Sequence, residues 1–177
     1  HPAPQVTSGT CYGRSDVAVA PHEMAKVRAS LQATLPAGVP LYASPLHRCA
    51  ELAAALAQDL PASALHFDMR LAEMDFGAWE MQPWHAIARA EIDAWAADMA
   101  HYRPGGGEHV LAMTIRVDAF LQDLLREPHA TAVVVCHAGT IRLLCALQAG
   151  LPLEETALLA ASSAHKIAYG AAIRLDF

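Results

Sequence analysis

Short apolar runs alternate with longer segments of helical periodicity along this chain. The runs predict strands at 39–44, 64–67 and 133–135, and two closing strands at 165–169 and 172–177. Between them, apolar residues spaced three and four apart predict helices at 45–60, 83–99, 108–125 and from 139 to about 150. Pro45 is suited to the first position of its helix, and glycines at 105–107 predict a turn.

This alternation indicates the fold class. Strands and helices joined by short connections are typical of a mainly parallel sheet covered by helices on both faces, a three-layer α/β/α sandwich. The 177 residues suffice for one domain that buries roughly 70% of its unfolded surface. We find no repeat, low-complexity tract or linker, so residues 1–177 are interpreted as a single domain.

Charge and cysteine content narrow the choice of partners. A net charge of −6 argues against nucleic acid or an anionic membrane as the main partner. The longest segment without charged residues, 29–47, contains several prolines and cannot form a spanning helix. Four cysteines without C-x-x-C spacing suit reduced thiols, which predicts a cytoplasmic protein that needs no disulfide. The sequence leaves the oligomeric state open.

The run VVVCHAGTIR, from Val133 to Arg142, carries the strongest chemical signal. Its three valines predict a buried strand, and Gly139 with Thr140 opens the following helix, so His137 lies at their junction. Unpaired N–H groups and the positive end of the dipole make such a helix start a natural phosphate site.

Two further positions fit the same kind of pocket. Arg48 falls in the first turn of another helix that follows a strand, the same setting as that of His137, so two separate edges of the predicted sheet are able to offer phosphate-binding groups to one pocket. Glu73 lies in the loop LAEMDFGAWE, where Phe76 and Trp79 are suited to anchor the loop and fix the carboxylate. Taken singly, these residues are equally compatible with ordinary structural or surface roles.

Four motifs, taken in order, resemble the histidine phosphatase superfamily, also called the phosphoglycerate mutase-like family, over essentially the whole chain. They are His1, the segment SPLHR that ends at Arg48, the loop LAEMDFGAWE that contains Glu73, and HAG from His137. The resemblance implies a phosphoglycerate mutase-like fold. It also implies a metal-independent phosphatase, without cofactor, that acts on a small phosphorylated substrate.

Carried over by position, the resemblance assigns a role to each motif. His1 attacks phosphorus and becomes a phosphohistidine, while Glu73 protonates the leaving oxygen and then activates water. Arg48 grips the phosphoryl oxygens, and His137 donates to them as charge shifts in the transition state. The backbone N–H of Ala138 adds one more donor.

The sequence departs from the family pattern around His1. The pattern has an arginine directly before this histidine and an apolar strand before that, whereas the sequence starts at His1. We interpret both as lying outside the numbering. Pro2 replaces the usual glycine and Pro4 a common threonine, which removes one backbone donor and one hydroxyl.

Two short segments, CYGRSD and WEM, resemble the branch of the family that includes α-ribazole phosphatases of cobalamin biosynthesis. In that setting Tyr12 and Arg14 are suited to face a nucleotide-like ring, through stacking and charge respectively. We expect both to bind substrate.

Three other functions fit parts of the sequence. A mutase of the phosphoglycerate mutase type would return the phosphoryl group to substrate instead of water. A cysteine-dependent phosphatase would use the C-x5-R spacing from Cys136 to Arg142, although Cys136 directly follows the buried valines, where a thiol is a poor nucleophile. A non-catalytic phosphate-binding module would have no need of Glu73.

Overall fold

The computed structural model describes residues 1–61, 64–163 and 167–177. Its centre is a parallel sheet in the order β2-β1-β3, formed by β1 (Leu41–Ala43), β2 (Leu65–Phe67) and β3 (Val133–Val135). Leu41 of the middle strand lies opposite Leu65 on one side and Val133 on the other. All three strands were predicted from the sequence, although the central one is shorter than expected.

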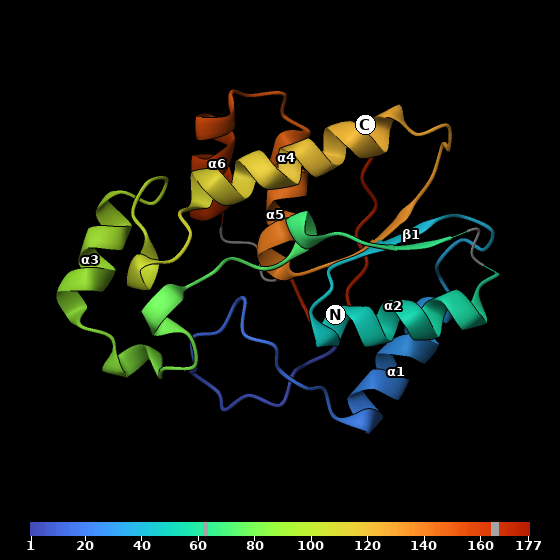
Figure 1. Ribbon diagram of the computed structural model, residues 1–177, viewed down its shortest axis with the longest axis horizontal. Coiled ribbons are helices and arrows are strands. Elements are labelled where there is room, and N and C mark those ends of the chain that lie inside the picture. Colours follow the sequence, from blue (N-terminus) through green and yellow to red (C-terminus); the bar gives the residue numbers. More distant parts are fainter. Residues whose placement is uncertain (62–63, 164–166) are drawn as a thin grey trace.

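Helices cover both faces of this sheet (Figure 1). One face carries α1 (Pro21–Gln32) and α2 (His47–Asp59), and the other carries α4 (Val110–Arg126), α5 (Ala138–Leu147) and α6 (Leu153–Ser162). A sixth helix, α3 (Arg89–Ala97), lies beyond one end of the sheet. Short 3-10 turns occupy Met69–Leu71, Gly77–Trp79, Trp84–Ala86 and Pro104–Gly106. The expected three-layer α/β/α architecture is therefore confirmed.

Side chains along the strands point alternately to the two faces of the sheet, so the interior is divided into two main hydrophobic cores. Leu41 and Ala43 pack with α1 and α2, whereas Tyr42 packs with the α4–α6 layer. A smaller cluster around Cys11, Trp79 and Ile87 lies under the loops next to α3. The residues of β1 and β3 are buried or half-buried on both faces, whereas β2 is the more exposed strand.

Two predicted helices differ in their limits. Helix α2 begins at His47 after Leu46 as its cap, so Pro45 precedes the helix instead of opening it. The predicted helix 83–99 is broken at Ile87 and Ala88, whose backbones are extended. Ile87 is buried against the Trp79 cluster, and this tertiary contact overrides the local helical pattern.

The closing strands are the clearest error of the sequence-based prediction. Residues 172–177 form no strand, and neither do residues 167–169 of the other predicted strand, whose residues 165 and 166 lie outside the described part of the chain. Backbone groups here bond to neighbours that are not strands: the Asp176 carbonyl accepts from the Gln148 amide, and the Gly170 N–H donates to the His1 carbonyl. Helices α1 and α6 were not predicted, although Pro21 and the acidic pair Glu154–Glu155 mark their first turns.

Two turns, at Gly77 and Gly105, pack closely against each other and hold the loop that follows β2. A Cβ atom at Gly105, whose φ is +57°, would lie 2.4 Å from the carbonyl oxygen of Phe76. One at Gly77 would lie equally close to the carbonyl oxygen of Gly105, at 2.4 Å. This backbone contact fixes the end of the segment 71–80. Within the described residues, no helix combines the length and the apolarity needed to cross a membrane.

Candidate active site

The predicted site residues gather where the strands end. Ser44 follows β1, His137 follows β3, and the segment 71–80 continues from the end of β2. The carboxyl ends of parallel strands share one edge of a sheet, which is where α/β folds place ligands. Residues 1–16 complete this edge.

Two imidazole rings form the centre of the site. The ring centroids of His1 and His137 are 5.0 Å apart, and the ring of Tyr169 lies 5.8 Å from that of His1 on another side. Nδ1 of His1 is 2.8 Å from the carbonyl oxygen of Pro2. Since a carbonyl only accepts, this bond places a proton on Nδ1 and leaves the lone pair on Nε2.

His137 is fully buried at the start of α5. Its Nε2 lies 2.7 Å from the hydroxyl oxygen of Ser44 and 3.5 Å from Sγ of Cys49. Burial, and to a lesser degree the nearby charge of Arg48, lowers the pKa of His137 well below its usual value. At neutral pH the ring is therefore uncharged, with one nitrogen as donor and one as acceptor.

Arg48 has no exposed surface, although it carries a permanent charge. Its Nη1 donates to the carbonyl of Ser15 at 2.9 Å and its Nη2 to that of Gly13 at 2.5 Å. Its Nε has no partner in the described part of the chain. The Tyr12 ring covers the group, with the guanidinium carbon 5.7 Å from the ring centroid. A buried cation with a free donor is suited to an anion.

Glu73 is oriented by α5 and by its own loop. Its Oε2 accepts the backbone N–H of Gly139 at 3.0 Å, and its Oε1 accepts that of Met74 at 3.0 Å. A Cβ atom at position 139 would lie 2.3 Å from Oε1, so a larger residue there would require the carboxylate to shift. From α4, Arg116 donates to the carbonyls of Ala72 at 2.7 Å and Glu73 at 3.3 Å.

Tyr12 and Arg14 lie on the outer side of the site. The hydroxyl oxygens of Tyr12 and Tyr169 are 2.7 Å apart, so the two rings bridge the mouth above His1 and Arg48. Arg14 is exposed and lies 3.6 Å from a carboxylate oxygen of Asp75. Burial raises the pKa of Tyr12 strongly, assisted by the bond to Tyr169, so its phenol stays protonated.

The structure brings the four motifs to one edge of the sheet. The rings of His1 and His137 adjoin, the charge of Arg48 acts on His137, and Glu73 is bonded to the first turn of α5. Ala138 is the first residue of α5, and an N–H group at this position has no acceptor within the helix. The sequence reasoning missed Ser44, which stands inside SPLHR, and Tyr169, for which the sequence carries no recognisable signal.

The alternative cysteine site does not form. Cys136 is buried behind the strand end, and burial strongly raises the pKa of its thiol. Arg142 donates to the carbonyls of Ala161 at 3.0 Å and Ser163 at 2.7 Å, which end α6. Residues 138–142 are helical and do not form a loop around an anion. This arrangement gives no support to a phosphocysteine.

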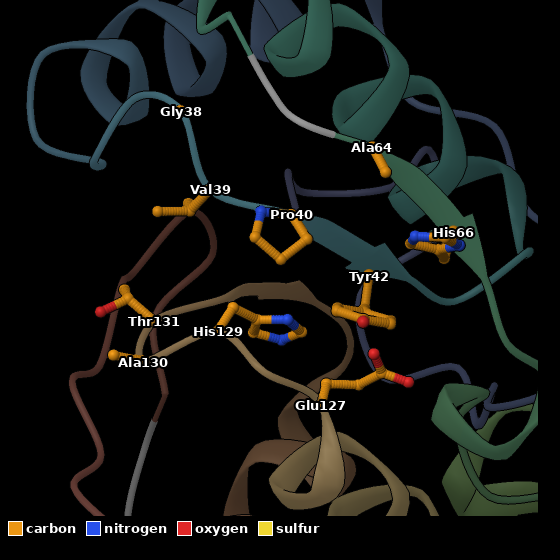
Figure 2. A pocket seen from close by; sticks show the side chains of 10 residues that line it. All are labelled: Gly38, Val39, Pro40, Tyr42, Ala64, His66, Glu127, His129, Ala130 and Thr131. Carbon is orange, nitrogen blue, oxygen red and sulfur yellow. The ribbon is translucent and has the colours of Figure 1, made fainter.

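A cavity lies at the other end of the sheet (Figure 2). It measures about 540 Å³ and is lined by residues that precede the strands, such as Pro40, Ala64 and Thr131. Tyr42 stands in it between the rings of His66 and His129, at centroid distances of 5.0 and 6.0 Å. None of the predicted site residues lines it. Across the described residues, no three His, Cys, Asp or Glu side chains gather as metal ligands.

Fold and site together define an α/β protein with two histidines and a buried arginine at the carboxyl edge of its parallel sheet. The model of the histidine phosphatase superfamily, branch 1, matches residues 4–168. The chain belongs to this superfamily.

Named relatives refine this membership. The adenosylcobalamin/alpha-ribazole phosphatase of Escherichia coli (strain K12) is 35% identical over 88 residues, which cover 48% of this chain and 43% of that protein. Phosphoserine phosphatase 2 of Hydrogenobacter thermophilus, an assignment that its name marks as provisional, is 27% identical over 118 residues, or 65% of this chain and 58% of that protein. The chain thus spans about half the length of the curated relatives it matches.

Solved structures agree on the fold. The alpha-ribazole phosphatase of Shigella flexneri superposes with a TM-score of 0.73 at 25% identity, covering 88% of this chain and 80% of that one. A mycobacterial glucosyl-3-phosphoglycerate phosphatase gives a TM-score of 0.72 at 23% identity, covering 90% and 81%. The phosphoglycerate mutase-like architecture is thereby confirmed.

The lowered pKa of His137 predicts a pH dependence of stability. Below about pH 6.5, unfolded His137 binds a proton that the buried ring refuses, so the free energy of unfolding falls as pH falls. The slope attributable to this residue is up to about 1.4 kcal/mol per pH unit between pH 6.5 and 5. We expect His137→Gln, measured by urea unfolding, to lack this component.

A matched control is His85→Gln, which alters an exposed histidine. It should retain the wild-type slope. Equal slopes for the wild type and His137→Gln would contradict a neutral, buried His137.

Proposed function

We propose that this chain is a phosphomonoesterase that hydrolyses a small phosphorylated metabolite through a phosphohistidine on His1. The observation that carries the proposal is the pair of imidazoles with centroids 5.0 Å apart, set beside a buried guanidinium. One ring presents a lone pair, the other is neutral, and the cation has a free donor. In this proposal His1 is the nucleophile, His137 is the hydrogen-bonding partner and Arg48 is the group that holds the anion.

In the first step, Nε2 of His1 attacks phosphorus while the bond from phosphorus to the ester oxygen breaks. Glu73 in its acid form gives its proton to that oxygen, and the alcohol leaves. In the second step, water attacks the phosphohistidine, Glu73 takes a proton from this water, and the N–P bond breaks. The products are inorganic phosphate, free His1 and protonated Glu73.

The other groups act on the phosphoryl oxygens. Arg48 neutralises part of their charge, and His137 and the N–H of Ala138 donate as charge develops in the transition state. Because Arg48 has no exposed surface, Tyr12 must move aside before a phosphoryl group reaches it. The substrate therefore displaces the bond between Tyr12 and Tyr169 as it enters.

For the substrate, we propose α-ribazole 5′-phosphate. Support comes from the segments CYGRSD and WEM and from the name of the E. coli relative. Tyr12 stacks on the base, and Arg14 places its charge against it.

We propose further that hydrolysis needs no metal or other cofactor. Four free cysteines are consistent with a cytoplasmic location.

The first test identifies the nucleophile. A phosphohistidine is labile to acid and stable to base, so rapid quenching with ³²P-labelled substrate should trap an acid-labile label on the protein. We expect His1→Ala to abolish this label and turnover. Cys136→Ser should keep both, because the cysteine lies behind the strand end. EDTA should leave the rate unchanged. Loss of turnover in Cys136→Ser with an intact His1→Ala would exclude the histidine mechanism.

The second test concerns the general acid. Glu73→Gln removes the proton donor but keeps an oxygen that can accept from Gly139. We expect kcat for alkyl phosphates to fall about 10²- to 10⁴-fold, because their leaving oxygen must be protonated. The rate with p-nitrophenyl phosphate, whose leaving group needs little protonation, should fall far less. An equal loss for both esters would assign Glu73 another role.

The third test concerns the substrate. Among phosphomonoesters that include phosphoserine and glucosyl-3-phosphoglycerate, α-ribazole 5′-phosphate should give the highest kcat/KM. We expect Arg14→Ala to raise KM for it about two- to fivefold and to leave p-nitrophenyl phosphate unaffected, as a contact between cation and ring at an exposed site is worth about 0.5–1 kcal/mol. Arg89→Ala on α3, also exposed, is the control. A different best substrate would refute this assignment while leaving the phosphatase proposal intact.

A further inference from the structure

The carboxylate of Glu80 receives five hydrogen bonds, although it is not among the groups assigned to the reaction. Its Oε2 accepts the N–H groups of Gly13 at 3.0 Å and Ser15 at 3.2 Å, and the hydroxyl of Ser15 at 2.5 Å. Its Oε1 accepts the N–H groups of Arg14 at 2.9 Å and Phe76 at 3.0 Å. These bonds hold the pKa of Glu80 below its usual value despite burial, so the carboxylate is ionised at neutral pH.

The loop that Glu80 binds is also the loop that holds Arg48. The N–H groups of residues 13–15 point at the Glu80 carboxylate, while the carbonyls of Gly13 and Ser15 point at the guanidinium. One short stretch of backbone thus lies between an anion and a cation. Its peptide dipoles are aligned with both charges, which strengthens both sets of bonds.

The loop has little freedom on its remaining side. A Cβ atom at Gly13 would lie 2.0 Å from the carbonyl oxygen of Met74, so the backbone there is in close contact with the segment that carries Glu73. The hydrogen bonds to Glu80 therefore fix the position of residues 13–15. The carbonyls of this loop in turn fix the position of the guanidinium.

From this geometry we propose that Glu80 is a positioning residue: through the loop 13–15, its carboxylate fixes the direction in which Arg48 presents its free N–H to the phosphoryl group. The role rests on the function proposed above, in which Arg48 holds the phosphoryl oxygens. Glu80 itself touches neither substrate nor reacting atoms.

The variant Glu80→Gln distinguishes the hydrogen-bonding role of the carboxylate from the space that the side chain fills. The amide has the same shape, but one of its two ends is an NH₂ group that cannot accept. Since Oε1 accepts two donors and Oε2 three, at least two N–H or O–H groups of the loop lose their partner in either orientation. The loop must move to find other acceptors, and its carbonyls move with it.

A double-mutant cycle between positions 80 and 48 tests the proposal, with affinity for tungstate as the first readout. Tungstate imitates a phosphoryl group, and calorimetry detects its binding without turnover. We expect Glu80→Gln to weaken binding and to lower kcat/KM for p-nitrophenyl phosphate about ten- to a hundredfold, the range produced by small misplacement of a binding group. In the Arg48→Lys background the same change should have little effect, because lysine lacks the fork that the two carbonyls orient.

The control is Glu91→Gln in the first turn of α3, an equivalent chemical change at an exposed site. It should leave binding and rate unchanged. If Glu80→Gln does not fold, Ser15→Ala takes its place, because it removes a single bond to the carboxylate. That variant should give a smaller loss in the same direction, again only when Arg48 is present.

Additive losses at the two positions would overturn the proposal, because Glu80 would then act independently of Arg48. Tight tungstate binding with the expected coupling, but no turnover by the wild type, would overturn the phosphatase reaction and leave the positioning role intact. If the wild type binds no tungstate, both the phosphate pocket and the role of Glu80 are wrong.

Discussion

A guanidinium without exposed surface is the constraint on which this site depends. Arg48 cannot lose its charge, so the fold has to supply acceptors for it inside the protein. Two of them are carbonyls of the loop 13–15, and that loop is held in turn by the carboxylate of Glu80. The neutral state of His137 follows from the same burial and the same neighbouring charge. A single buried cation at the start of α2 thereby holds the loop 13–15 by hydrogen bonds and contributes to the neutral state of His137 at the start of α5.

Glu73, the proposed general acid, is held by contacts from α4 and α5. Arg116 reaches from α4 to the carbonyls around Glu73 and pairs with Glu108 at 2.7 Å. The N–H of Gly139 then orients the carboxylate itself. Glu73 and Arg48 thus have different supports, which adjoin where the backbone at Gly13 packs against the carbonyl of Met74. Their positions relative to each other depend on the packing of α4 and α5 against the sheet, which is the part of the fold that the sequence pattern predicts best.

The sequence predicted the elements whose signals are local. The three strands, α4 and the strand-to-helix junction at His137 follow from short-range periodicity alone. Helix 83–99 was wrong because the burial of Ile87 depends on a tryptophan elsewhere in the chain. The closing strands were wrong because apolar residues form a strand only where another strand is available for pairing, which composition does not reveal.

The candidate site divides in the same way. Sequence motifs identified four of the candidate residues, His1, Arg48, Glu73 and His137. The structure adds the tertiary contacts around them, which the motifs do not reveal. Tyr169 bonds to Tyr12, 157 residues away, and no local pattern marks either end of that bond. Glu80 stands inside a motif, yet its partners lie in the loop 13–15. Contacts of this kind depend on the tertiary fold. Residues of one motif, such as Glu73 and Glu80, therefore bond to different parts of the chain.

The missing side chain at Gly139 links two motifs that are separate in the sequence. The carboxylate of Glu73 occupies the volume that a methyl group would need at position 139, and it is bonded to the N–H of that same residue. A larger residue at 139 would displace the carboxylate from this place, and a shorter acid at 73 would leave the N–H of Gly139 without this acceptor. The backbone at the start of α5 thus acts as a mould for the carboxylate, since the space and the hydrogen bond that Glu73 uses both come from one residue.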